Sequence, residues 1–151
     1  MFLFSPQVQK VLEEAGWSPS RSVPVTEWIK NLTDVGYKPF PLAIAILENL
    51  GGLEITPPTN QSNLFFPCKI VFDPVYAASS EFDRIKKWQE EHGLWLFPLG
   101  EYDPLFILMC SSGGRIFGGR ESRFDLLGDS IEDALELRIF ASRRPIPHVK
   151  A

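Results

Sequence analysis

The chain has 151 residues, 44% of them hydrophobic, and carries a formal net charge of −4. This size suits one compact domain covering residues 1–151. No stretch approaches the roughly 18 apolar residues of a membrane span, and no basic stripe follows the chain, so a membrane protein and a nucleic-acid binder are both excluded as expectations.

The start of the chain does not look like an export signal. It lacks basic residues ahead of its apolar run, and Pro6 interrupts that run. We therefore expect a cytoplasmic location. Cys68 and Cys110 could form one disulfide, but in a reducing compartment two buried thiols are the stronger expectation.

Three helices are predicted in the first third of the chain. Ser5 followed by proline starts the first, which ends at Gly16, and the second covers about 25–35, with Gly36 as its stop. The third, over 41–50, is apolar on nearly every side, so it is expected to be the buried helix.

A glycine pair follows this third helix. Gly51 stands where a helix often ends in a left-handed residue, and Gly52 would let the chain reverse into a strand over 53–56. A phosphate-binding loop needs the opposite order, in which glycines precede a helix. The pair is therefore interpreted as a helix end with a left-handed Gly51.

The middle of the chain predicts a strand and a long helix. The strand covers about 66–72, and Asp73 followed by proline starts a helix that runs without a break to Gly93. Its apolar residues recur at helical spacing from Val75 to Gln89.

The last third reads as strands and one helix. Strands are expected over 94–100, 104–110, 115–119 and 123–129, with a glycine turn at 111–114. Ser130 and Asp133 form a capping-box-like start for a final helix, and the proline-containing tail, 143–151, is expected to be irregular. Together these elements predict an α+β fold with a mixed, mostly antiparallel sheet flanked by helices.

No catalytic, metal or cofactor site is predicted. The two histidines, His92 and His148, are far apart in sequence, and neither has a cysteine or aspartate at ligand spacing. Neither has a marked nucleophile beside it.

One group of acidic residues stands out as a partner-binding candidate. Four carboxylates lie on or just before the first turns of the last helix, where they are expected to be exposed and to form a docking stripe for a basic partner. Two further residues are expected near them. The full set is Asp129, Glu132, Asp133 and Glu136, with Glu101 and Tyr102.

Several short segments, in order along nearly the whole chain, resemble the SUKH superfamily, specifically its third branch of immunity proteins. They are Gly16-Trp17-x-Pro19-x-Arg21, Leu50-Gly51-Gly52-Leu53, Phe72-Asp73-Pro74 with Ala77, Phe97-Pro98-Leu99-Gly100, Gly114-Arg115-Ile116-Phe117, and Leu127-Gly128-Asp129-Ser130 leading into Ala134-Leu135.

The resemblance implies a bacterial immunity protein that binds and neutralises a cognate polymorphic toxin, often a nuclease or another nucleic-acid-directed enzyme, without catalysis of its own. The motif residues are expected to be architectural. Two alternatives stay open: a regulatory adaptor, since a fold does not fix a function, and a small hydrolase that joins His92 or His148 to a serine or carboxylate. The oligomeric state is not predicted.

Overall fold

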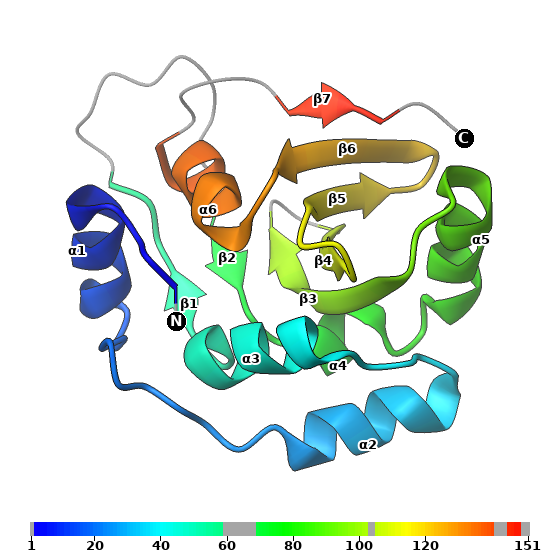
Figure 1. The fold of residues 1–151 in the computed structure, drawn as a ribbon, viewed down its shortest axis with the longest axis horizontal. Coiled ribbons are helices and arrows are strands. Elements are labelled where there is room, and N and C mark those ends of the chain that lie inside the picture. Colours follow the sequence, from blue (N-terminus) through cyan, green and yellow to red (C-terminus); the bar gives the residue numbers. More distant parts are fainter. Residues whose placement is uncertain (1, 59–68, 103–104, 141–144, 149–151) are drawn as a thin grey trace.

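Figure 1 shows the computed structural model of the chain, which describes residues 2–58, 69–102, 105–140 and 145–148. Within these residues six helices and seven strands follow one another. The helices are α1 (Pro6–Glu14), α2 (Thr26–Val35), α3 (Pro41–Leu50), α4 (Pro74–Ala78), α5 (Phe82–His92) and α6 (Ile131–Phe140). The strands are β1 (Glu54–Ile55), β2 (Ile70–Val71), β3 (Leu96–Tyr102), β4 (Phe106–Ser111), β5 (Ile116–Arg120), β6 (Arg123–Gly128) and β7 (Ile146–Pro147).

The strands form one sheet whose spatial order is the order along the chain, β1 to β7. Every described pair is antiparallel, so the predicted α+β class is confirmed, and no parallel pair is seen among the described strands. Antiparallel neighbours need only short connections, which is why β3 to β6 follow each other as hairpins.

Helices cover both faces of the sheet (Figure 1). A side chain at Gly119 would meet Trp88 of α5, whereas one at Gly118 would meet Tyr102, above which α6 places the guanidinium of Arg138. Since successive residues of a strand face opposite sides, α5 and α6 lie on opposite faces of the sheet.

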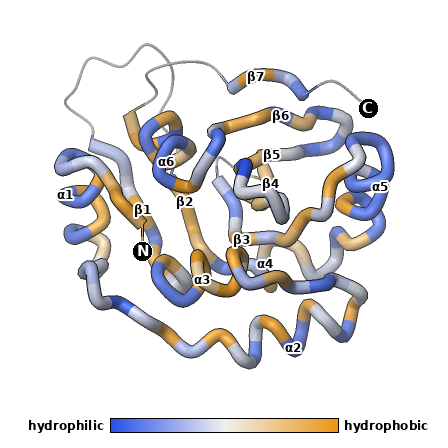
Figure 2. The backbone as a smooth tube through the Cα atoms, in the orientation of Figure 1, coloured by the Kyte–Doolittle hydropathy of each residue, from blue (hydrophilic) through white to orange (hydrophobic). Residues whose placement is uncertain are grey.

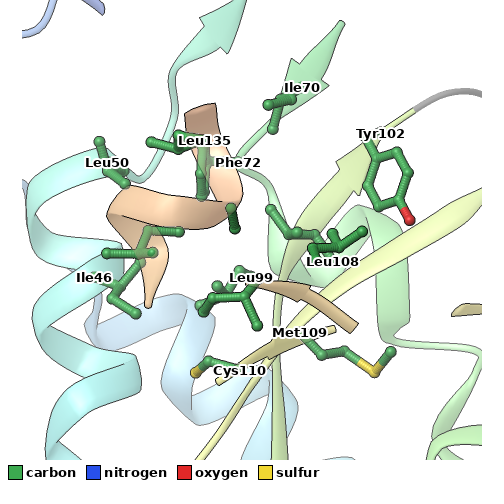
Figure 3. Packing of buried hydrophobic residues seen from close by; sticks show 14 of the residues in the cluster. Ile46, Leu50, Ile70, Phe72, Leu99, Tyr102, Leu108, Met109, Cys110 and Leu135 are labelled. Atoms are coloured by element: carbon green, nitrogen blue, oxygen red, sulfur yellow. The ribbon is translucent and has the colours of Figure 1, made fainter. Parts of the chain in front are cut away.

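The core runs continuously between α3, α6 and the central strands. Figure 3 shows Ile46 and Leu50 of α3 beside Leu135 of α6, all directed toward the sheet. In Figure 2 hydrophobic residues likewise run along α3, α6 and β6. The helix predicted to be buried, α3, buries Ala43, Ile46, Leu47 and Leu50.

The motif residues hold elements together. Trp17 donates its indole Nε1–H to Oδ1 of Asn49 at 3.0 Å, and Arg21 donates to the carbonyl of Gly51 at 2.6 Å, so both fasten the segment after α1 to the end of α3. The side chains of Asp73 and Ser130 each accept a backbone N–H in the first turn of a helix. The architectural interpretation of these residues is confirmed.

The prediction for the glycine pair is wrong in detail. Gly51 has φ −57° and ψ 140°, which is not left-handed, and Gly52 instead holds the positive φ of 83°. The reason for glycine at position 51 is space, because a Cβ there would collide with the Leu47 carbonyl and the Trp28 ring.

The predicted long helix over 74–92 is two helices, α4 and α5, separated by residues 79–81. The carbonyl of Ala78 accepts a hydrogen bond from the phenol of Tyr37 at 2.8 Å and from the backbone N–H of Glu81 at 3.1 Å. A continuous helix would give this carbonyl to the N–H of Phe82 instead. A tertiary contact therefore ends α4.

The tail is also more regular than predicted. Residues 146 and 147 form β7, which pairs with Leu126 and Asp125 of β6, and His148 donates its backbone N–H to Phe124 at 2.9 Å. Proline at position 147 is compatible with this because β7 is an edge strand. Cys110 is buried and free, while Cys68 lies outside the described residues.

Candidate partner-binding surface

The four acidic residues at the start of α6 do not form an open stripe. Asp129 is exposed (84% of its side chain), and its carboxylate lies 3.6 Å from the guanidinium of Arg115. Glu132, Asp133 and Glu136 are half-buried, so their predicted exposure is wrong. The reason is that α6 is buried on nearly all sides.

Two of these carboxylates have structural partners. Glu132 accepts the backbone N–H of Leu3 at 3.1 Å, which fastens the N-terminal segment to α6. Asp133 accepts the backbone N–H of Asp129 at 3.2 Å, and its own N–H bonds to Ser130 Oγ at 3.1 Å. This confirms the predicted capping pattern, and it gives Asp133 a role in the helix start.

Tyr102 is not a surface residue. Only 3% of it is exposed, its ring stacks on Phe106 with centroids 5.2 Å apart, and the guanidinium of Arg138 lies 4.6 Å from its ring centre. Figure 3 shows it within the core cluster. The expected exposure of Tyr102 is therefore wrong, because the cation above it and the sheet below it enclose the ring, while its contact with a partner stays a prediction.

Glu101 lies on the opposite face of the sheet from α6, since it alternates with Tyr102 along β3. It lines a cleft of about 550 Å³ that opens between α4, the start of α5 and the ends of β3 to β5. Hence the structure does not bring Glu101 together with the acids of α6. It brings Glu101 together with Tyr76, Arg84, Leu105, Arg120 and Glu121.

This cleft combines apolar and charged lining. Ile107, Ala77 and Gly119 contribute apolar surface, while Arg84 pairs with Glu81 at 3.1 Å and Arg120 lies 6.0 Å from the ring centre of Phe106. Among the residues that the structure describes, neither Glu101 nor Glu121 makes a side-chain hydrogen bond or ion pair. The uncompensated charge inside the cleft is therefore mainly negative.

Backbone strain is concentrated at the same cleft. In the described part of the chain, two residues other than glycine have positive φ: Leu105 at 78° and Glu121 at 54°. Both line the cleft. A left-handed leucine is unusual, because its Cβ crowds the backbone carbonyl, and such residues cluster at functional sites.

Tyr76 connects this cleft to a second one. Tyr76 is 73% exposed and also lines a cleft of about 660 Å³ between α2 and α4, together with Trp28, Glu27 and Asp73. The two helices are neighbours in Figure 1. One exposed aromatic residue thus stands between two hollows of the surface.

The histidines meet although they are far apart in sequence. Nδ1 of His148 lies 3.0 Å from Nδ1 of His92, and both rings pack on Phe124. Burial, then the charges of His92 and Arg115, lowers the pKa of His148. No group of three or more histidine, cysteine, aspartate or glutamate residues placed to hold a metal ion is found within the described ranges.

Cys110 has no features of a reactive thiol. Burial raises its pKa well above the ordinary value, and a backbone hydrogen bond offsets this only in part. Since the thiolate is the nucleophile, the thiol of Cys110 stays neutral and packs as a small hydrophobic residue.

Of these cleft residues, Glu101 was a candidate from the sequence, whereas Tyr76 and Leu105 were not. Tyr76 lies off the apolar stripe of the predicted helix, which was the available signal for an exposed aromatic residue. Leu105 has no such signal, because leucine is not a residue type that marks a positive φ.

Comparison with known proteins gives one match. The model of a family described as SUKH-3 immunity protein matches residues 4–138. No curated protein and no solved structure matches the chain. None of the described helices has the length and apolar character needed to cross a membrane.

Proposed function

The chain belongs to the SUKH-3 immunity protein family, and from this premise we propose that it binds a cognate polymorphic toxin directly and neutralises it in the cytoplasm. The observation that carries the proposal is the family match, which covers 4–138 and therefore every described element except the end of α6 and β7. Inhibition is proposed to come from binding, without catalysis by this chain.

A basic toxin is the expected partner. The chain has a formal net charge of −4, and a nuclease or another nucleic-acid-directed enzyme needs a positively charged surface for its substrate. Opposite charges would speed the encounter of the two proteins. This supports a toxin of that class as the target.

The acids of α6 are proposed to act at a distance. Asp129, Glu132, Asp133 and Glu136 add negative potential to one end of the molecule, although most of them are half-buried. Charges of this kind raise association rates more than they strengthen the bound complex. Direct contact with the toxin is proposed elsewhere, on the face that carries Glu101.

Co-expression tests the proposed function. A candidate toxin domain, chosen from the genes that neighbour this chain's gene, is expressed in a sensitive host, alone and together with the chain. We expect growth arrest with the toxin domain alone, and full growth together with a stoichiometric purified complex when both are present. Toxicity that persists at high levels of the folded chain would contradict neutralisation.

The same experiment separates the adaptor alternative. An adaptor would bind other cellular proteins and leave the growth arrest unchanged. The hydrolase alternative predicts that protection depends on the imidazoles, so a His92→Gln, His148→Gln double variant should lose protection. We expect that variant to protect as the wild-type chain does.

A further inference from the structure

We propose that the toxin docks on a continuous surface around Tyr76, and that it does so with a basic segment that carries a bulky apolar side chain. We call this area the Tyr76 surface: the two clefts that share Tyr76, with Leu105 and Glu121 on the outer rim of one and Trp28 in the other. The inference rests on the proposed function and specifies its contact face.

Two exposed apolar side chains border the first cleft. Tyr76 is 73% exposed and Leu105 is 66% exposed, and both line a hollow whose lining includes the buried Ile107. Large side chains beside a pocket are typical of the central, most energetic part of a protein interface, where tyrosine is enriched. Because most of the Leu105 side chain is exposed in the free protein, burying it would contribute free energy only when a partner binds.

The strain at this cleft points the same way. Leu105 and Glu121 are held in the left-handed region, at φ 78° and φ 54°, although glycine would fit either position without strain. Each places a side chain at the rim of the same hollow. A leucine and a glutamate in place of glycine at these strained positions are explained if their side chains have a contact to make.

Charge selects a basic partner segment. The two clefts together are lined by five carboxylates, those of Glu27, Asp73, Glu81, Glu101 and Glu121, and by two guanidinium groups, those of Arg84 and Arg120. Arg84 is already paired with Glu81, and the described residues that line the second cleft include no lysine or arginine. Glu101 and Glu121 are therefore available to pair with a lysine or, in a bidentate manner, an arginine.

Photo-crosslinking tests both the place and the partner chemistry. A benzophenone amino acid replaces Tyr76 in the full chain, which is mixed with the purified toxin domain from the neighbouring gene. The matched control carries the same group at Leu3, which is 78% exposed at the N-terminus. We expect crosslinks from position 76, and not from position 3, to a toxin segment that contains lysine or arginine.

Affinity measurements on folded variants complete the test. We expect Tyr76→Ala to weaken binding at least tenfold, Tyr76→Phe to retain most of it, and Leu3→Ala to change it less than twofold. Glu101→Lys should weaken binding at least tenfold. Glu14→Lys makes the same charge change at an exposed position of α1 and should have only a small effect. Leu105→Gly should weaken binding while the thermal midpoint of the free chain stays equal or rises.

The outcomes are distinct. If the wild-type chain binds and protects while Tyr76→Ala and Glu101→Lys bind as tightly as wild type, the Tyr76 surface is excluded and the proposed function stands. Crosslinks to an acidic segment would overturn the partner chemistry. A wild-type chain that neither binds nor protects would overturn the proposed function, and this inference would fall with it.

Discussion

At the scale of single residues, the turn after α3 shows how much one missing side chain can determine. Gly51 lies against Trp28 of α2 and against the Leu47 carbonyl, and the carbonyl of Gly51 accepts a hydrogen bond from Arg21. Three separate segments therefore meet at a position where only a hydrogen atom fits. The residue is a packing requirement rather than a conformational one, because its φ of −57° is open to any amino acid.

We predict that Gly51→Ala destabilises the chain by about 1–3 kcal/mol, the usual cost of overpacking a filled interior. Gly113→Ala is the matched control, since the nearest atom to a Cβ there is Ser111 Oγ at 3.9 Å. Urea unfolding followed by circular dichroism measures both variants. Equal midpoints for the two alanine variants would contradict the packing argument.

Residue-level interpretation from the sequence succeeded where the cause was local. Ser5, Asp73 and Ser130 cap helices as predicted, because a hydroxyl or carboxylate acts on N–H groups within the next few residues. It failed at Gly51 and Tyr102, whose environments are made by distant segments. Spacing along the chain carries no information about which side chain arrives from elsewhere.

At the scale of secondary-structure elements, the last strand of the sheet, β7, is followed by a contact between two imidazole rings. β7 pairs with β6 through residues 146 and 147, and His148 follows directly, in contact with His92 at the end of α5. The contact of Nδ1 with Nδ1 needs one neutral ring to accept the proton of the other. The attachment of β7 therefore depends on protonation.

We predict that acidification loosens β7. The pKa of His148 in the folded chain is below its ordinary value, because burial and the charges of His92 and Arg115 disfavour the protonated ring. The unfolded chain thus takes up the proton first, so the stability from this contact is complete above about pH 6.5 and is lost as the pH falls below it.

Thermal midpoints at pH 7.5 and pH 5.5 measure the effect. The wild-type chain should lose more stability between these values than His148→Gln, and hydrogen exchange should show earlier opening of the His148 amide, which bonds to Phe124. An identical loss in both proteins would mean that other groups carry the pH dependence.

Element boundaries from the sequence came within two residues for α1, α2, α3 and the strands from β3 to β6, where apolar periodicity and glycine positions agree. The split between α4 and α5 was missed, because the carbonyl of Ala78 accepts a hydrogen bond from Tyr37, which is distant in sequence. Strand β7 was missed for a similar reason, since a strand of two residues, one of them Pro147, has no pattern of its own.

At the scale of the whole molecule, the acids of α6 and the proposed contact surface lie apart. The acids near the start of α6 lie on one face of the sheet, and the Tyr76 surface lies toward the other, beside α4 and the start of α5. Composition alone predicted an acidic protein with a basic partner. It could not separate the acids near the start of α6 from those that line the cleft.

We predict that neutralising the α6 acids changes the rate of association and leaves dissociation nearly unchanged. The variant combines Asp129→Asn, Glu132→Gln and Glu136→Gln, and keeps Asp133 because its carboxylate accepts the Asp129 N–H. Binding of the toxin domain, measured by surface plasmon resonance at several salt concentrations, should show slower association and a weaker salt dependence. A tenfold faster dissociation would instead place these acids in the contact.

The sheet described above has outer strands, β1 and β7, of only two residues each. Long unpaired strand edges invite other chains to add to a sheet, and short ones give an intruding strand too few backbone groups to hold. The two short outer strands therefore protect the longer, apolar strands between them from edge-to-edge aggregation. Any condition that detaches β7 would expose the edge of β6 and lower the solubility of the protein before it unfolds.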